Sequence, residues 1–193
     1  MALWGITDAD EAKPKWLSTA QKKEVFANNS GWVVEAGSTM TGNDNVDAQP
    51  EVLCCIGDLA TGIGAADITE IEFITTAFDK SDGGNIDVRV RFNEAVTVNT
   101  SGGTPTLTIT NDTPSRNLTA TYLSGSTTNE LIFRKTIAAA NAATNAGDVL
   151  SIGANPLALA SGTIKDTADG TTNATITSVA SIGAAAGTIT VAA

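Results

Sequence analysis

The chain contains no histidine in its 193 residues. Histidine is the commonest general acid or base in enzymes and a common ligand of zinc and copper. Its absence excludes the serine and cysteine triads that depend on it, and also the zinc-binding HExxH motif. We therefore expect a protein that is not an enzyme, with no catalytic residue, metal or cofactor.

Basic residues and cysteines are also scarce. The chain has 11 Lys and Arg against 21 Asp and Glu, a formal net charge of −10. This charge repels nucleic acid and anionic lipid, so neither is an expected partner. Cys54 and Cys55 are adjacent, and successive strand residues point to opposite faces, so we interpret them as free thiols. Free thiols favour folding in a reducing compartment.

Long apolar runs are absent as well. No stretch approaches the roughly 20 apolar residues that a helix needs to span a membrane. The first residues lack the basic and apolar regions of a signal peptide, since Asp8, Asp10 and Glu11 follow a short apolar run. We expect a soluble chain that is made in a cytoplasm and has no transmembrane segment.

A clear alternation of apolar and charged residues runs from Ile86 to Phe92. A period of two indicates a half-buried strand, with one face in a core and the other in water. Arg89 and Arg91 then lie on the solvated face, where they can pair with Glu70 or Glu72 across a sheet. Further strands are expected at 31–35, 51–56, 68–74, 106–110, 118–122, 131–134, 149–152, 157–159, around 164 and at 175–179.

These short strands alternate with turn residues every 8–12 positions or so, which is typical of an all-β sandwich. A capping pattern at Ser18–Gln21 predicts a short helix over 21–26, and the glycine-rich 57–64 is expected to be a loop. The weakly apolar end is expected to be an extended tail, free or added to a sheet edge. The predicted divisions are 1–67, a docking segment, 68–180, the sandwich, and 181–193, the tail.

The docking segment contains every tryptophan of the chain and a cluster of lysines. Two interpretations are open. The tryptophans can complete a small local core, or some of them can anchor the chain to a neighbouring protein, because tryptophan is prominent at interfaces. The second interpretation gives the candidate docking residues Trp4, Lys13, Lys15, Trp16, Lys22, Lys23 and Trp32.

Two pairs of turn carboxylates, Asp79 with Asp82 and Asp166 with Asp169, could contribute oxygens to a calcium ion. Aspartates in turns ordinarily accept hydrogen bonds from their own backbone. We favour this second interpretation, because no EF-hand spacing is present.

Several segments resemble the bacterial Ig-like repeats found in tandem in large surface adhesins. They are Val90–Val98, Gly103–Ile109, Ala120–Ser126, Leu131–Arg134, Leu150–Leu159 and Ser161–Asp166. The resemblance covers about residues 68–180 and implies an Ig-like antiparallel β-sandwich beside a small N-terminal docking subdomain. It implies no catalysis.

The opening of the chain resembles that of small virion structural proteins of T4-like marine cyanophages, at Met1–Gly5, Lys13–Leu17 and Gly31–Val33. This implies a phage virion protein, most simply a capsid decoration protein that stabilises the shell and is present in many copies. Its partner would be the major capsid protein or another virion protein. The alternatives are a tail or head-fibre component that binds host surface glycans, and a module of a bacterial surface adhesin.

Overall fold

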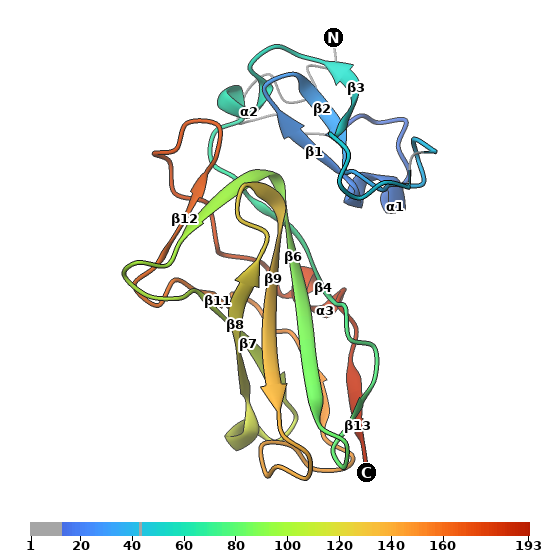
Figure 1. Cartoon of the computed structure of the whole chain (residues 1–193), viewed down its shortest axis with the longest axis vertical. Coiled ribbons are helices and arrows are strands. Elements are labelled where there is room, and N and C mark those ends of the chain that lie inside the picture. The colour runs from blue at the N-terminus through green and yellow to red at the C-terminus, as the bar shows by residue number, and fades with distance from the viewer. Residues whose placement is uncertain (1–12, 43) are drawn as a thin grey trace.

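The computed structural model describes residues 13–42 and 44–193. Strands dominate, so the prediction of an all-β sandwich is confirmed (Figure 1). The strands are β1 (Val25–Asn28), β2 (Gly31–Val34), β3 (Glu51–Cys55), β4 (Ile68–Phe73), β5 (Phe78–Asp79), β6 (Gly84–Asn99), β7 (Thr106–Asn111), β8 (Leu118–Ser124), β9 (Thr128–Ile137), β10 (Val149–Ser151), β11 (Leu157–Ala158), β12 (Thr163–Asp166) and β13 (Ile189–Ala192). The α-helices are α1 (Thr19–Lys23), α2 (Leu59–Gly62) and α3 (Ala180–Ala184).

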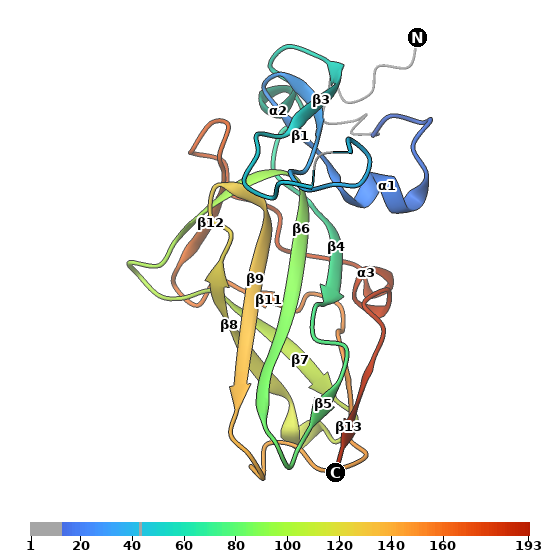
Figure 2. The same ribbon diagram turned by 45° about the vertical axis from the view of Figure 1, so that its right-hand side comes forward.

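Strand β6 is the longest strand and has neighbours along both edges. On one edge it pairs with β9, and on the other with β4 in its first half and β12 in its second half. The sheet continues from β9 through β8, β7, β10 and β13 to β5. It turns back on itself, so that β7 lies behind β6 and β9 in Figure 2. Two contacts, β1 with β6 and β13 with β5, are parallel, so the sheet is mixed rather than antiparallel throughout.

The sandwich core follows the predicted alternation along β6. Ile86, Val88 and Val90 are completely buried, and Phe92 is nearly so. Every second residue of a strand lies on the same face, so these four side chains enter one core together. That core extends from Ala66 to Val191 along the sequence.

The N-terminal unit, which we define as the described residues up to Ile63, has a second and separate core. The fully buried Trp32 lies in that core with side chains from β1, β2 and α2 and with Leu17, which precedes α1. The unit stands at one end of the long axis of the molecule, and the C-terminus at Ala193 lies at the other end (Figure 1). The small core ends at Ile63 along the sequence, and the main core begins at Ala66.

Three local predictions near the N-terminus and in the late strands need correction. Helix α1 ends at Lys23, and Val25 and Phe26 begin β1, because both are buried and pair with β2. The predicted loop at 57–64 contains α2. The predicted strand at 175–179 is absent, and only Thr175 forms an isolated bridge, with Asp67.

The predicted tail at 181–193 belongs to the sandwich. Helix α3 begins at Ala180, and β13 pairs with both β10 and β5. Ile189 and Val191 are almost completely buried in the main core. The end of the chain is therefore neither free nor added at a sheet edge, because residues 189–192 form a strand with a neighbour on each side.

The two thiols are free, as predicted, with Cys54 half-buried and Cys55 exposed on β3. None of the helices in the described part of the chain is long and apolar enough to cross a membrane.

Candidate functional site at the junction of the two units

The middle of β6 is buried on both faces where the N-terminal unit meets the sandwich. Residues Val90 to Glu94 are all buried, and among them Arg91 is 6% exposed and Glu94 0% exposed. The N-terminal unit covers the outer face here, since Ala27 of β1 pairs in parallel with Glu94. The prediction that Arg91 lies on a solvated face is therefore wrong, because another part of the chain covers that face.

Arg91 stands at the centre of a cluster of carboxylates. Its Nη1 atom lies 2.8 Å from Glu70 Oε2 and 3.2 Å from Glu72 Oε1, and its Nε lies 2.6 Å from Glu130 Oε1. Arg89 pairs with Glu72 in the same cluster. The predicted pairing of the two arginines with the glutamates of β4 is confirmed. Glu130 on β9 was not foreseen.

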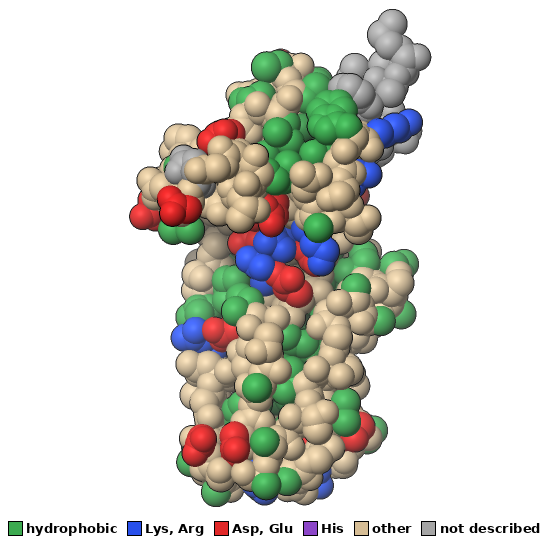
Figure 3. All heavy atoms as spheres, turned by 90° about the vertical axis from the view of Figure 1, so that its right-hand side faces the viewer, with side chains coloured by type: hydrophobic (Ala, Val, Ile, Leu, Met, Phe, Trp, Pro, Cys, Tyr) green, Lys and Arg blue, Asp and Glu red, His purple; other side chains and the backbone are tan. Residues whose placement is uncertain are grey.

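The N-terminal unit adds its own charges to this cluster. Glu35, directly after β2, lies 3.3 Å from Arg91 Nε, and its carboxylate accepts a hydrogen bond of 2.6 Å from Asn129 Nδ2. On the other side of the unit, Lys23 of α1 forms an ion pair with Glu70. Figure 3 shows basic and acidic side chains gathered between the two units. We call Arg89, Arg91, Glu35, Glu70, Glu72, Glu130 and Lys23 the junction cluster.

Burial and charge act against each other in the junction cluster. Burial raises the pKa of Glu35, and the neighbouring Glu130 raises it further against the pull of Arg91. Burial also works to raise the pKa of Glu70, but hydrogen bonds from Lys23 and Arg91 outweigh it, so that this pKa is lowered. Burial disfavours the charged Arg91, yet its carboxylate neighbours raise its pKa overall. Arg91 therefore remains charged although it is buried.

The structure divides the candidate docking residues into three groups. Trp32 is completely buried in the small core and has no surface to offer a partner, so the local-core interpretation holds for it. Lys15 and Trp16 face outward, and the side chain of Trp16 is 57% exposed. Trp4 lies outside the described residues. The remaining lysines lie around a pocket.

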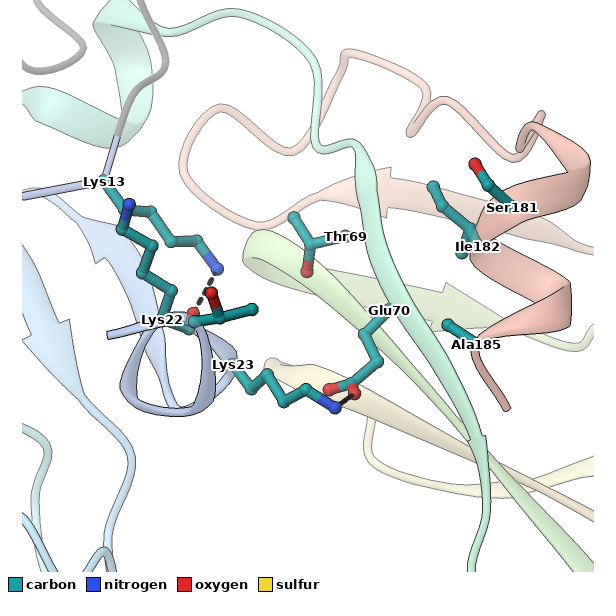
Figure 4. A pocket seen from close by; sticks show the side chains of 9 residues that line it. Lys13, Lys22, Lys23, Thr69, Glu70, Ser181, Ile182 and Ala185 are labelled. Atoms are coloured by element: carbon teal, nitrogen blue, oxygen red, sulfur yellow. Dashed lines mark hydrogen bonds and ion pairs between the residues drawn. The ribbon is translucent and has the colours of Figure 1, made fainter. Parts of the chain in front are cut away.

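This pocket has a volume of about 370 Å³ and opens between α1, β4 and α3 (Figure 4). We call it the lysine pocket, and its lining residues are Lys13, Thr19, Lys22, Lys23, Thr69, Glu70, Ser181, Ile182 and Ala185. Lys13 donates a hydrogen bond of 2.8 Å from Nζ to the Lys22 carbonyl. Burial lowers the pKa of Lys13 to about 8, although the nearby charge of Glu35, and to a lesser degree that of Glu70, raises it. The positive charges of Arg91 and Lys22 act in the same direction as burial.

Two other pockets border the junction. One, of about 230 Å³, has Asn28, Asn29, Glu94 and Asp166 among its lining residues. Burial raises the pKa of Asp166. The other, of about 530 Å³, lies between the loop that contains Val46 and the start of β9. Among residues 13–42 and 44–193, no group of three or more His, Cys, Asp or Glu side chains is placed to hold a metal ion.

Three of the four turn aspartates, Asp79, Asp166 and Asp169, accept hydrogen bonds from the backbone of their own turn, as the favoured interpretation holds. Asp79 Oδ1 accepts hydrogen bonds from the backbone nitrogen and the hydroxyl of Ser81. Asp169 accepts from Thr171 and Thr172, and the hydrogen bond from the Thr172 side chain contributes most to lowering the pKa of Asp169 to about 2.

Four contributors to the junction and its lysine pocket were missed from the sequence: Glu35, Asn129, Glu130 and the face of α3. Glu35 and Asn129 are 94 positions apart and yet hydrogen-bonded. The one available signal was the position of Glu35 at the end of the apolar strand 31–34, which places a charge where the strand leaves its core.

Comparisons of the chain with protein-family models, with curated proteins and with solved structures gave no match.

Proposed function

We propose that this chain is a non-enzymatic structural protein of a phage virion, most simply a capsid decoration protein. The N-terminal unit holds the shell and the sandwich faces outward. Two resemblances support this function, that of the opening segments to cyanophage virion proteins and that of residues 68–180 to Ig-like repeats.

The observation that carries the proposal is the junction cluster. It fixes the N-terminal unit at one end of the long axis, so that the sandwich extends away from it (Figure 1). A buried network with several mutual partners favours one geometry over others, because any displacement leaves a charge unpaired. A protein held at one end and displayed at the other needs such a fixed orientation.

The outward side chains of the N-terminal unit suit a protein contact. Trp16 exposes more than half of its side chain, and Lys15 is exposed beside it in the sequence. Tryptophan residues are common anchors at interfaces, and a lysine nearby suits an acidic partner surface.

A binding assay with particles tests the proposal. The purified full chain is incubated with expanded empty capsids of a T4-like marine cyanophage and sedimented with them. We expect saturable binding at a regular stoichiometry, and about tenfold weaker binding for Trp16→Ala, as for the loss of an interface anchor. Val179→Ala is the matched control, since Val179 is an exposed apolar side chain on the sandwich.

Three results would contradict the proposal. The chain could fail to bind capsids while it binds host glycans, which would favour the fibre alternative. Trp16→Ala and Val179→Ala could lower capsid binding equally. The purified chain could turn over a substrate, which would exclude a purely structural role.

A further inference from the structure

We propose that the lysine pocket binds an acidic peptide segment of a partner protein, in which an aspartate or glutamate lies next to an apolar side chain. The inference deepens the proposed function and rests on it for the identity of the partner, a virion protein. It places the contact in a pocket rather than on the exposed tryptophan alone.

Positive charge is concentrated in this pocket although the chain as a whole carries −10. Three of the 11 basic residues line it. Lys13 uses one N–H donor on a backbone carbonyl and keeps the others. The half-buried Lys22 side chain forms no hydrogen bond or ion pair with any of the described residues. The lining carboxylate, Glu70, is shared between Lys23 and Arg91, so the pocket retains an excess of positive charge.

The opposite wall of the pocket is apolar. Figure 4 shows Ile182 and Ala185 of α3 across the pocket from the lysines. Thr69 of β4 lies between the two sides, and Ser181 lies next to Ile182 on α3. A carboxylate can therefore meet the lysines while a neighbouring apolar side chain lies against Ile182. Hydroxyls can accept or donate hydrogen bonds to a peptide backbone.

The lining favours an acidic peptide over an acidic sugar. No aromatic side chain of residues 13–42 or 44–193 lines the pocket, so this part of the chain offers no ring face on which a pyranose could stack. The cations are lysines, which act as point charges on flexible stems and adapt to a single carboxylate. The volume of about 370 Å³ accommodates a short segment and excludes a folded domain.

The state of Lys13 gives the pocket a pH dependence. Burial lowers its pKa to about 8 against the opposing charges of Glu35 and Glu70, and the positive charges of Arg91 and Lys22 lower it further. The ammonium group is therefore charged at neutral pH and loses its charge as the pH rises through this value. Affinity for a carboxylate should fall over the same range, because one of the pocket cations is lost.

Titration of the full chain with a peptide tests the inference. The probe is a terminally blocked peptide of alternating glutamate and leucine, and the matched neutral probe has glutamine in place of glutamate. We expect the acidic probe to bind wild type and to bind Lys22→Glu at least about tenfold more weakly. Lys135→Glu makes the same charge change at a half-buried lysine of β9 that does not line this pocket, and should bind as wild type does.

A second variant tests the pocket without a change of charge. Ala185→Trp places a large side chain in the space opposite the lysines, and should weaken the acidic probe to a similar degree. The urea midpoint of each variant confirms that it is folded. Equal binding by wild type, Lys22→Glu and Ala185→Trp would overturn the inference.

Two further probes separate the sources of negative charge. Glucuronate tests an acidic sugar and inorganic phosphate tests a free anion. If either binds as tightly as the peptide and with the same dependence on Lys22, the assignment to an acidic peptide is wrong.

The capsid assay separates this inference from the proposed function. If Lys22→Glu binds capsids as tightly as wild type, the pocket is not the docking site and the proposed function stands. If wild type fails to bind capsids while the peptide binds at Lys22, the virion role is wrong and the pocket has another partner.

Discussion

Arg91 shows how a single residue can hold two parts of a chain together. Its buried guanidinium faces Glu35 from the N-terminal unit and Glu70, Glu72 and Glu130 from the sandwich. Replacement of a buried ion pair by apolar residues is often neutral, but removal of one partner leaves uncompensated buried charge and is costly. The cluster around Arg91 therefore serves mainly to fix how the two units are oriented. Removal of Arg91 should strongly destabilise the folded chain.

We expect Arg91→Met to lower the free energy of unfolding by about 3–5 kcal/mol, because the glutamates lose their common counter-charge. Urea denaturation at pH 7 measures this. Arg89→Met is the control, since the Arg89 side chain is 29% exposed against 7% for Arg91 and should cost clearly less. Equal losses from the two variants would show that burial of Arg91 is not what matters.

The glutamates should give the stability a pH dependence of two signs. The lowered pKa of Glu70 contributes stability that is present above its ordinary pKa of about 4.5 and is lost as the pH falls through the folded value. The raised pKa of Glu35 acts oppositely, since the folded state holds this proton more tightly, so stability rises as the pH falls toward it.

Urea denaturation over a range of pH measures both contributions. We expect Glu70→Gln to show a smaller loss of stability than wild type when the pH falls below about 4.5. Wild type should also gain stability as the pH is lowered toward 4.5 from above, and Glu35→Gln should lack this gain. Identical pH profiles for both variants and wild type would contradict the assigned roles.

At the scale of elements, β13 closes the sandwich although its sequence is weakly apolar. It lies between β10 and β5, and alternate side chains enter the core. Close approach of strands also shapes the N-terminal unit, where a Cβ at Gly31 would lie 2.0 Å from the Cys54 carbonyl oxygen. A residue other than glycine would force β2 and β3 apart there, and Gly31 has a positive φ of 131° as well.

Two substitutions on β13 test its place in the core. Val191→Asn buries a side-chain amide that has no hydrogen-bond partner, at a site that is 2% exposed. It should lower the free energy of unfolding by about 2–3 kcal/mol. Thr190→Asn on the outer face of the same strand should change stability by no more than about 0.5 kcal/mol. Equal, small effects in urea denaturation would mean that residues 189–192 are not a structural strand.

At the scale of the whole molecule, two cores are joined through a polar interface. Each core alone is modest, and the junction cluster couples them across β6. Such coupling should make the two units unfold together. When one unit unfolds, the charges that it covers on the other unit lose their partners and become exposed.

Spectroscopy can follow the two units separately. Trp16 and Trp32 lie in the N-terminal unit and the sandwich sequence contains no tryptophan, so changes in the fluorescence of these two residues report the N-terminal unit. Far-ultraviolet circular dichroism reports mainly the strands of the sandwich. We expect coincident urea transitions for wild type, and an earlier fluorescence transition for Arg91→Met. Coincident transitions in both proteins would show that coupling does not depend on Arg91.

The sequence by itself determined most of the sandwich strands, and which residues of β6 share a face. The alternation at 86–92 gave the inward set of Ile86, Val88, Val90 and Phe92, and also the pairing of Arg91 with Glu70. Both follow from the period of two in a strand, which is a local property of the backbone. The concentration of tryptophan and lysine near the N-terminus was likewise visible without coordinates.

Only the tertiary structure decided what covers each face. Alternation assigned Arg91 to water, yet the N-terminal unit lies over it, and its partner Glu130 is 39 positions away. Trp32 is enclosed and Trp16 exposed for the same kind of reason, since burial depends on which distant segments pack nearby. The lysine pocket too exists only because α1 and α3, at opposite ends of the sequence, meet across β4.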